Sequence, residues 1–522
     1  MTEKISIEEM TTFCKKKGLV YPSGEIYGGV AGFFDFGPLG VEIKNNIKQH
    51  WWKTFVQQRQ DIVGLDGSII THPQVWRASG HVDCFADFVL KCSNIDKCGL
   101  EVRADHFIED ALKVSVSGKA ADINWSEMNA AQINKIIASN KLKCPQCKSD
   151  FKEVENFNLM FQTQIGPKKD GKNVAYLRPE TAQLIFTNFK LIHEHARMNL
   201  PFGIAQIGKA FRNEISPRDF LFRSREFEQM EIEYFVQPDH INDCPFIEQY
   251  LEYNMQVLTS EAQNKKGTHT TMTIQQMLDQ KLTSTWHCYW LVQIHQWFVQ
   301  LGVQAENLRV REHMKSELAH YAGACFDFEY QFPFGWKEIH GSADRTQFDL
   351  SQHLKVSGKE MSIYDEETKG KIIPYVAAEP SQGVERALLV FLYDAYEYDK
   401  ERGNVVLRLH PSLAPIKVGV FPLVNKINEK AKEVYEKIKN NFYAMYDKSG
   451  SIGRRYARAD EIGIPYCVTL DFESLQDEDC TIRDRNTTKQ IRVKIVDLKE
   501  ILQKLLHGEM AFEKAGKIIP TK

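Results

Sequence analysis

Two strand-like runs joined by one short loop, within residues 202–236, constrain the fold of this chain more than any other feature. The runs read FGIAQIGKAFRNE and FEQMEIEYFV, with ISPRDFLF between them. Side chains two positions apart lie on the same face of a strand, so Arg212 and Glu214 share a face, as do Phe227, Gln229 and Glu231. We therefore expect an antiparallel strand pair with one charged face. The alternative is a solvated helix face, the usual explanation of a charge run.

The charges of this strand pair fall into two zones. Arg212, Arg223 and Arg225 lie near the loop with the aromatic Phe227, and we expect Arg223 and Arg225 to share a face. Carboxylates such as Glu231 lie farther along. Guanidinium groups suit phosphates, and carboxylates suit an amino group. The pattern predicts a site for an anion and a planar ring beside a cation, which a triphosphate, an adenine and an ammonium would satisfy.

The rest of the chain predicts two domains, 1–410 and 412–522. At 522 residues the chain is too long for one core. The stretch LDGSIITHPQVW predicts a strand interrupted at Pro73, which should lie at an edge or where the strand ends. Residues from about 92 to 155 and from about 240 to 325 are interpreted as insertions, the second of them helical.

The later segments predict further elements. FDFEYQFPFGWKEIHGSADR is strand-like, and EPSQGVERALLVFLYDAY predicts a turn that leads into a buried helix. After a proline-bearing connector the pattern alternates between strand and amphipathic helix, which is typical of a separate α/β domain.

Composition narrows the classes of protein. The net charge of −3 and pI near 6.6 exclude a general coat of positive charge for nucleic acid, so an RNA partner must be bound by local patches. No run of about 18 apolar residues occurs, so no membrane association is expected. The acidic start MTEKISIEEM and eleven scattered cysteines favour a cytoplasmic protein. Neither a Rossmann nor a P-loop glycine motif occurs.

Several motifs carry a family resemblance. FRNE, a loop and RSREF resemble motif 2 of class II aminoacyl-tRNA synthetases, and EPSQGVERALL resembles motif 3. The helix VEIKNNIKQHWWKTFV with the Pro73 strand resembles motif 1. The longer match FRNEISPR…REFEQMEIEYF is similar to glycyl-tRNA synthetases of the α2 type. AYLRPETAQLIF, RADHFIED, WKEIHGSADRTQFDL and GSIGRRYARADEIGIPY resemble further signatures of that family, and the resemblance covers most of residues 8–500.

The resemblance implies a multidomain α+β and α/β fold, in which helices flank an antiparallel sheet and an α/β anticodon-binding domain follows. It implies activation of glycine with ATP and Mg²⁺ to glycyl-adenylate, transfer of glycine to tRNA(Gly), and side synthesis of diadenosine polyphosphates. It also implies a homodimer, which would cover the apolar face that the tryptophan-rich helix and the Pro73 strand otherwise expose.

Two alternatives remain beside this function. The first is a catalytically inactive, synthetase-like accessory subunit that binds nucleic acid; such relatives typically lack the active-site arginines, whereas Arg212, Glu214 and Arg386 are present here. The second is an amino-acid adenylating enzyme without a tRNA substrate, which would have little use for the C-terminal module.

For ATP, the resemblance puts Arg212 on the α-phosphate, Glu214 near the adenine and Phe227 against the base. Fixed guanidinium groups stabilise the charge that develops in an in-line attack, and a carboxylate suits Mg²⁺. Arg212, Glu214 and Arg386 are the implied catalytic residues. The implied ATP-binding residues are Arg212, Asn213, Glu214, Phe222, Arg223, Phe227, Glu338, Ile339, Gly383 and Arg386, with Glu338 also serving Mg²⁺.

For glycine, the resemblance brings three glutamates, Glu180, Glu231 and Glu379, to the ammonium group. Three carboxylates in one small site repel each other unless a cation or hydrogen-bond donors balance them, so the cluster makes sense with an amine ligand. Arg345 and Arg103 would lie on the carboxylate side of glycine. Ser381 would close the pocket over the α-carbon.

In the C-terminal domain, the run GRRYAR combines guanidinium groups with an aromatic ring, which suits unpaired RNA bases. A solvated turn is the alternative. The resemblance assigns anticodon binding to Arg454, Arg455, Tyr456 and Arg458, with phosphate contacts from Arg483, Arg485 and Arg492.

Two cysteine pairs bracket the first insertion, with spacing C-x5-C and C-x2-C. The second pair has the spacing of a zinc knuckle, whereas the first is wider than usual. We expect either a structural Zn²⁺ or ordinary reduced thiols in a flexible insertion. The residues are Cys92, Cys98, Cys144 and Cys147.

Overall fold

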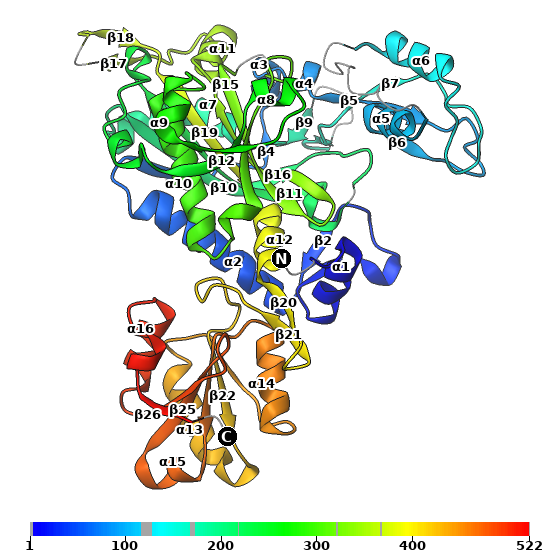
Figure 1. Ribbon diagram of the computed structural model, residues 1–522. Coiled ribbons are helices and arrows are strands. Elements are labelled where there is room, and N and C mark those ends of the chain that lie inside the picture. Colours follow the sequence, from blue (N-terminus) through cyan, green and yellow to red (C-terminus); the bar gives the residue numbers. More distant parts are fainter. Residues whose placement is uncertain are drawn as a thin grey trace.

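The computed structural model describes residues 4–115, 128–167, 173–217, 219–319, 322–365 and 368–520. Its larger, N-terminal body lies above a smaller C-terminal body in Figure 1, and a small lobe of residues near 86–158 projects from the larger one. Among the described residues, no helix is long and apolar enough to cross a bilayer.

One mixed sheet organises the larger body. Its neighbours pair antiparallel except β10 with β3 and β12 with β14, which are parallel. In spatial order its described strands are β13 (Thr270–Thr273), β12 (Asn254–Leu258), β14 (Leu308–Glu312), β15 (Ala324–Phe332), β16 (Gly335–Asp344), β19 (Tyr375–Gly383), β11 (Glu226–Val236), β10 (Phe202–Phe211) and β3 (Ile62–Leu65). The expected antiparallel sheet of a class II core is confirmed.

The predicted strand pair lies in this sheet as β10 and β11. Phe211 pairs with Glu226 at the loop end and Phe202 with Phe235 at the other. From Met230 onward, the even-numbered residues of β11 are buried in the apolar core. The odd-numbered face is therefore left for the charged side chains, because successive residues alternate across a sheet.

Residues 240–325 are less helical than expected. They form the long helix α10 (Thr285–Gln300), but they also supply β12, β13 and β14 to one end of the main sheet. These strands are only four or five residues long, and periodicity alone seldom separates such short runs from neighbouring helices.

The stretch EPSQG is a strand, not the expected turn. It completes β19, which leads directly into α12 (Val384–Ala395). Proline has no amide hydrogen to donate, and the ladder between β19 and β11 is interrupted between Ser381 and Ala378, on either side of Pro380. This interruption lies next to the candidate site.

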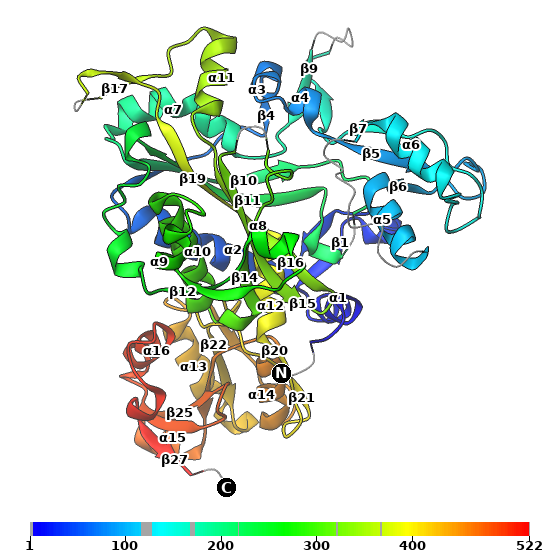
Figure 2. The ribbon, with the colours of Figure 1, turned by 45° about the horizontal axis from the view of Figure 1, so that its top comes forward.

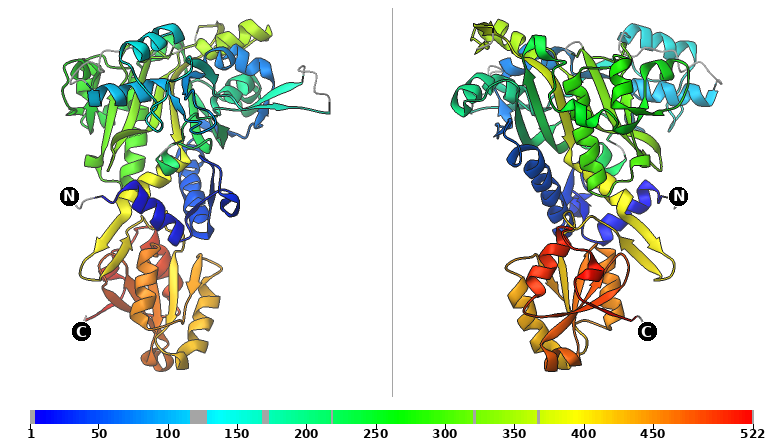
Figure 3. Two further views of the ribbon diagram at one scale, coloured as in Figure 1. Left: turned by 90° about the vertical axis from the view of Figure 1, so that its right-hand side faces the viewer. Right: turned by 60° about the vertical axis from the view of Figure 1, so that its left-hand side comes forward.

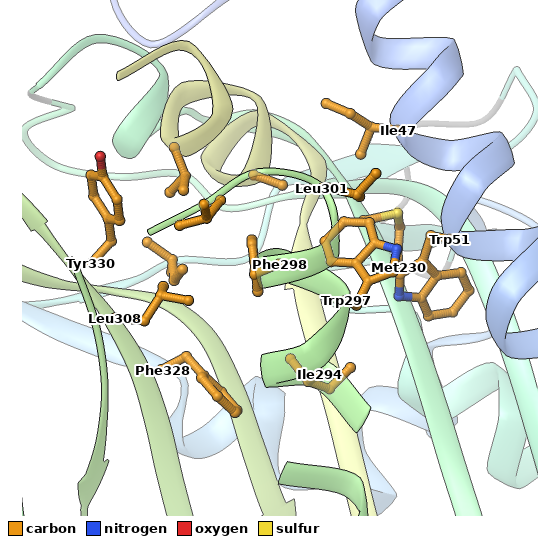
Figure 4. Close-up of a cluster of buried hydrophobic side chains, with 14 of the residues drawn as sticks. Ile47, Trp51, Met230, Ile294, Trp297, Phe298, Leu301, Leu308, Phe328 and Tyr330 are labelled. Carbon is orange, nitrogen blue, oxygen red and sulfur yellow. The ribbon is translucent and has the colours of Figure 1, made fainter. Parts of the chain in front are cut away.

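The main apolar core lies on the face of the sheet away from Glu231, and a second apolar cluster that includes Ile204, the β10 partner of Glu233, lies on the other face. Trp51 of α2 (Pro38–Trp52) and Trp297 of α10 pack beside Met230 of β11 (Figure 4). Both tryptophan side chains are buried within one protomer. The prediction that a tryptophan-rich helix leaves an uncovered face is therefore wrong for these helices.

Pro73 begins a helix. It is the first residue of α3 (Pro73–Ala78), and the strand before it, β4, covers only Ile70–Thr71. Proline fits the first helical position because that amide has no partner in the helix. Of this segment, Ile70 stays partly exposed.

The first insertion is folded where it is described. A three-stranded sheet of β6 (Glu101–Arg103), β5 (Ala86–Lys91) and β7 (Glu155–Asn158) packs with α5 (Ala104–Ser115) and α6 (Ala130–Ser139), as Figure 2 shows. A second small sheet links this lobe to the body through β4, β9 (Val174–Leu177) and β8 (Gln162–Gln164).

Shorter elements complete the larger body. They are α1 (Ile7–Lys16), β1 (Val20–Pro22), β2 (Phe34–Phe36), α4 (His81–Cys84), α7 (Ala182–Ala196), α8 (Ser260–Asn264), α9 (Ile274–Asp279), α11 (Phe348–Ser357), β17 (Ile363–Asp365), β18 (Gly370–Ile372), β20 (Tyr396–Asp399) and β21 (Asn404–Leu407).

The C-terminal body is the expected α/β domain, with its own core (Figure 3). Its strand order is β23 (Ala444–Tyr446), β22 (Val418–Pro422), β24 (Tyr466–Leu470), β25 (Asp479–Asp484), β26 (Gln490–Lys494) and β27 (Lys517–Ile519). The first three are parallel and the others antiparallel. Its helices are α13 (Asn428–Ile438), α14 (Ile452–Glu461), α15 (Phe472–Asp477) and α16 (Leu498–Leu506).

Candidate active site

A cavity of about 360 Å³ lies on the charged face of the main sheet. Strands β11, β16 and β19, the loop between β10 and β11, and the small lobe all contribute to its wall. The lining includes Phe85, Asp87, Arg103, Leu159, Arg212, Glu214, Phe222, Arg223, Phe227, Gln229, Glu338, Ile339, Gly341, Ser381, Gly383 and Arg386. Nine of the ten predicted ATP-binding residues are therefore together; Asn213 is not in the lining.

One end of the cavity carries guanidinium groups. Arg386, in the first turn of α12, donates from Nη1 to Glu338 Oε1 at 2.9 Å and from Nε to the carbonyl of Phe222 at 3.1 Å. Arg223 Nε lies 3.7 Å from Glu214 Oε2. The charge of Arg386 lowers the pKa of Glu338 below its ordinary value. Both arginines have a carboxylate partner that an anionic ligand could replace.

Arg212 lies between two aromatic rings. Its guanidinium carbon is 5.6 Å from the ring centre of Phe85 and 5.4 Å from that of Phe227, and its Nε donates to the carbonyl of Pro179 at 3.1 Å. These contacts fix the side chain while other N–H groups remain available to a ligand.

Arg225 does not share the face of Arg223. It donates from Nε to the carbonyl of Glu214 and from Nη1 to that of Ala31, and it is absent from the cavity lining. Both arginines precede the first residue of β11, so the strand alternation that predicted a shared face does not apply to them.

The small lobe forms one wall through Phe85, Asp87 and Arg103. Arg103 Nη1 lies 2.9 Å from Asp87 Oδ2, and its Nη2 lies 2.6 Å from Asp105 Oδ2. The Arg103 side chain is thus at the cavity, as expected of a site residue, and it is held there by two carboxylates.

Carboxylates gather where β11 and β19 lie side by side, next to the lining residue Ser381, although Glu180, Glu231 and Glu379 do not themselves line the cavity. Glu231 is almost fully buried and accepts hydrogen bonds from the Ser381 hydroxyl at 2.7 Å, from the amide of Thr181 at 3.1 Å and from the Thr181 hydroxyl. Burial and the charge of Glu180 raise the pKa of Glu231. The group is poised to ionise when a cation arrives.

Arg345 supports this cluster from behind. It is 1% exposed, donating to Glu379 Oε1 at 2.6 Å and to both carboxylate oxygens of Asp349 at 2.8 and 3.0 Å. Burial nevertheless raises the pKa of Glu379 to about 8, because Glu231 and Glu180 oppose the effect of Arg345. The family motifs place Arg345 on the carboxylate side of glycine. In the structure its guanidinium instead fixes Glu379 and Asp349, and Arg345 is not among the residues that line the cavity.

Two further acids complete the cluster. Glu180 lies 3.3 Å from His81 Nε2, and although burial opposes ionisation, the charges of His81 and Arg345 hold its pKa far below the ordinary range. Glu233 is fully buried, and neither of its oxygens has a hydrogen-bond partner among the described residues. Burial and the charge of Glu379 raise its pKa well above the ordinary value.

Comparisons with known proteins bear on this arrangement. Residues 161–394 match the model of the tRNA synthetase class II core domain (G, H, P, S and T), and residues 417–505 match the anticodon binding domain. The chain is 45% identical over 509 residues to the glycine–tRNA ligase of Caldanaerobacter subterraneus subsp. tengcongensis, which covers 97% of this chain and 100% of that protein.

The chain belongs to the glycine–tRNA ligase family. The family relatives from Geobacillus thermodenitrificans and Clostridium perfringens are 43% and 41% identical, over 96% and 97% of this chain and 97% and 100% of their own lengths. The resemblance found in the motifs is therefore confirmed at the level of the family.

The residues that the family resemblance assigned to the anticodon are only partly at the surface. On α14, Arg454 and Arg458 are exposed, and Arg458 Nη2 donates to Asp447 Oδ2 at 2.5 Å. Arg455 is buried and donates to the carbonyls of Pro422 and Leu423. Arg455 therefore fixes the helix to β22. The sequence alone does not distinguish this structural role from a contact with RNA.

Two of the arginines expected to contact phosphates are also internal. Arg483 is buried and donates to both oxygens of Asp460 at 2.8 and 2.9 Å, and its guanidinium lies 4.7 Å from the ring centre of Tyr456. Arg485 is buried and donates to the carbonyls of Gly463 and Leu409. Arg492 is partly exposed and pairs with Asp471 and Asp479.

The four predicted cysteines come together. Cys92 Sγ lies 3.3 Å from Cys147 Sγ, and Cys98 Sγ lies 3.6 Å from Cys144 Sγ. One ligand atom from each of the four lies within 4.8 Å of the others. A tetrahedron of sulfurs around Zn²⁺ has edges of about 3.8 Å, so the donor set fits that ion.

Sequence reasoning missed several residues of the site. Thr181, Asp349, His81 and Phe85 hold or enclose the predicted side chains, but each lies in a different element and has no motif spacing that singles it out. Gln229 was placed on the correct face by its alternation with Phe227 and Glu231, but was not assigned a role.

Proposed function

We propose that the chain is a glycine–tRNA ligase, which activates glycine with ATP and transfers it to tRNA(Gly). The observation that carries this proposal is a cavity lined by Arg212, Arg223 and Arg386, with a cluster of buried carboxylates beside its lining residue Ser381, in a chain 45% identical to a glycine–tRNA ligase over nearly its full length. The retained Arg212, Glu214 and Arg386 disfavour an inactive accessory subunit.

In this proposal, ATP lies at the arginine end. Arg212 binds the α-phosphate, Phe227 stacks on the adenine, and Arg223 and Arg386 bind the outer phosphates, where they exchange their glutamate partners for phosphate oxygens. Glu338 is about half exposed at the cavity and suits Mg²⁺, which would neutralise phosphate charge there. A second ATP in place of tRNA would yield diadenosine polyphosphates at the same arginines.

Glycine lies at the carboxylate end. Its ammonium balances Glu180, Glu231 and Glu379, and Ser381 occupies the space beside the α-carbon. Arg345 acts as a positioning residue for Glu379, and Arg103 faces the cavity from the opposite wall. Burial raises the pKa of Glu379 to about 8 and that of Glu231 above its ordinary value, and a bound ammonium favours the ionised form of both groups.

The reaction has two steps. A glycine carboxylate oxygen attacks the α-phosphorus, the bond to the pyrophosphate oxygen breaks, and the adenylate forms. A ribose hydroxyl at the tRNA end then attacks the glycyl carbonyl, the bond to the phosphate oxygen breaks, and AMP leaves with the hydroxyl proton on its phosphate. In the first step, preorganised guanidinium groups stabilise the charge that grows on the phosphate.

A direct test replaces Arg212. Arg212→Ala should lower glycine-dependent ATP–pyrophosphate exchange by about 10² to 10³, since one preorganised donor is worth about 3 to 4 kcal/mol. Arg225→Ala is the matched control, because Arg225 flanks the same loop and bonds only to backbone carbonyls among the hydrogen bonds described. Unchanged exchange in a folded Arg212→Ala protein would refute the phosphate assignment.

We also propose that the four-cysteine cluster holds a structural Zn²⁺. Metal analysis of protein purified without chelator should give about one zinc atom per chain, and Cys144→Ser should remove it and lower the melting temperature. Cys84→Ser is the control, because Cys84 is exposed and outside the cluster. Metal-free protein with four freely titrating thiols would contradict the zinc site and show that these residues are ordinary reduced cysteines.

A homodimer and a cytoplasmic location complete the proposal. The buried tryptophans no longer argue for a dimer, whereas the partly exposed Val41, Ile69 and Ile70 still do. Sedimentation at micromolar concentration should give a species of twice the 60.2 kDa chain mass. A species of one chain mass would exclude the dimer.

A further inference from the structure

A row of cross-strand partners extends beyond the cavity. Glu231 on β11 pairs with Ser381 on β19, Ser381 with Gly341 on β16, and Gly341 with Asp327 on β15. Directly opposite residues point to the same face of a sheet. Asp327 therefore lies on the face that carries Glu231 and Ser381, two strands or about 10 Å from Ser381.

Gly341 leaves the space between them open. A Cβ on this residue would meet no heavy atom within 4 Å among the described residues, and Gly341 itself lines the cavity. The space above Gly341 is therefore open on the cavity side of β16, next to its cross-strand partner Asp327. Any larger residue at position 341 would fill part of this open space.

Asp327 is half of a hydrogen-bonded pair. His313 Nε2 lies 2.7 Å from Asp327 Oδ2, and Asp327 is 9% exposed. Burial would lower the pKa of His313, but the hydrogen bond and charge of Asp327 raise it. Arg311 lies 3.7 Å from the same carboxylate, and burial followed by the charge of Glu338 raises the pKa of Asp327 to about 6. The pair lies beside the lining residues Glu338 and Gly341, although neither His313 nor Asp327 itself lines the cavity.

A metal ion is a poor occupant of this place. Cys325, His313 and Asp327 have ligand atoms within 4.8 Å of one another. However, burial and then the charge of Asp327 raise the pKa of the Cys325 thiol, which opposes the thiolate that a metal needs, and the Arg311 guanidinium adds a positive charge beside the carboxylate. The cluster is better suited to hydrogen bonds.

We propose that the His313–Asp327 pair binds a hydroxyl of the terminal ribose of tRNA, next to the hydroxyl that accepts glycine. This rests on the proposed function, in which the arginine end takes ATP and the glutamate end takes glycine. The remaining reactant is a ribose with adjacent hydroxyls, and a buried carboxylate held by histidine accepts a hydrogen bond from one of them. The pair orients the ribose, and the proton of the attacking hydroxyl still leaves on AMP.

The test separates transfer from activation. In Asp327→Asn, the rate of glycine-dependent ATP–pyrophosphate exchange should stay within about twofold of the wild-type rate. Single-turnover transfer from preformed glycyl-adenylate to tRNA should become about tenfold slower, because the ribose loses one hydrogen bond to a charged group. His313→Gln should act in the same direction. Glu329→Gln is the control, because Glu329 lies on the same strand with the same 9% exposure and pairs with Arg309 instead.

A second substrate makes the test specific to the hydroxyl. Two modified tRNAs are tested first, one ending in 2′-deoxyadenosine and one in 3′-deoxyadenosine. The one that still accepts glycine keeps the reactive hydroxyl and lacks its neighbour, and it serves as the deoxy tRNA. Wild type should transfer glycine to it more slowly than to intact tRNA, whereas Asp327→Asn should treat both alike. Two results would overturn the proposal. One is an equal loss of exchange and transfer in Asp327→Asn, and the other is a deoxy tRNA that slows transfer in Asp327→Asn as much as it does in wild type. Absence of glycine-dependent exchange in wild type would instead refute the proposed function.

Discussion

At the scale of single residues, the raised pKa of Glu379 makes the proposed ammonium site sensitive to pH. Its carboxyl is buried beside Glu231 and Glu180, and Arg345 offsets only part of that effect, so its pKa is raised to about 8. The neutral form prevails below this pH, and the ionised form, which binds a cation better, prevails above it.

The KM for glycine should therefore fall as the pH rises toward about 8. Below this pKa, each pH unit should lower the KM by up to about tenfold. Exchange assays across this range measure it, with the KM for ATP as the internal control. In Glu379→Gln the dependence should disappear and the KM should stay high. A glycine KM that is flat, or that rises with pH, would contradict the assignment of Glu379.

At the scale of elements, one buried lysine joins a helix, a strand and a second helix behind the cavity. Lys44 of α2 lies 2.7 Å from Glu228 of β11 and 2.6 Å from Glu385 of α12. Glu385 also accepts from the amide of Glu228 at 2.9 Å. This network sets the start of α12, which carries Arg386, against the strand that carries Phe227.

Lys44→Ala should destabilise the larger body by about 3 to 5 kcal/mol, because it leaves the buried Glu385 without its cation and Glu228 with Lys48 alone. Lys48→Ala, one turn later on the same helix, should lose under about 1 kcal/mol, since Lys48 is partly exposed and lies 3.2 Å from Glu228. Urea unfolding followed by tryptophan fluorescence compares the two midpoints. Equal midpoints would show that the network adds little stability.

At the scale of the whole molecule, the C-terminal body is held to the larger one by polar contacts. Arg402, in the turn between β20 and β21, donates to Asp460 at 3.2 Å and to the carbonyl of Arg485 at 2.8 Å. Asn46 of α2 donates to the carbonyl of Ala414 at 2.9 Å. The exposed face of α14 is thereby fixed relative to the cavity, far from its lining residues.

Replacing both Arg454 and Arg458 with alanine should lower kcat/KM for tRNA about tenfold or more, through the loss of two charged contacts to RNA. Glycine-dependent exchange should not change, because neither residue lines the cavity. Arg455→Ala is a contrasting variant: it should lower the melting temperature, since its guanidinium bonds to internal carbonyls. An equal loss of exchange in the double variant would contradict the assignment of tRNA binding to the C-terminal body and of glycine activation to the cavity.

The fold and the cavity differ in how much of them could be predicted. Period-two alternation placed Phe227, Gln229 and Glu231 on one face because all three lie within one long strand. The same rule was wrong for Arg225, which precedes the strand. The run that contains Arg455 gave no sign that this side chain is buried, because its burial depends on a helix that docks against β22. Contacts between distant segments, such as Arg345 with Glu379, follow from packing that local sequence does not encode.

Selectivity for glycine tests the central claim most directly. Ser381 donates to Glu231 at 2.7 Å and accepts from Gln229 at 3.3 Å, so it occupies the space beside the α-carbon in the proposed complex. A methyl group gains only about 1 to 3 kcal/mol in a pocket, and here it would have to break these polar contacts and overpack the site.

The measurement is ATP–pyrophosphate exchange with glycine, alanine and serine, in wild type and in Ser381→Gly. Wild type should respond to glycine and reject the other two, and Ser381→Gly should raise alanine activation relative to glycine while the KM for ATP stays the same. Comparable activation of alanine by wild type, or a Ser381→Gly protein with altered ATP binding and an unchanged amino-acid ratio, would contradict the account.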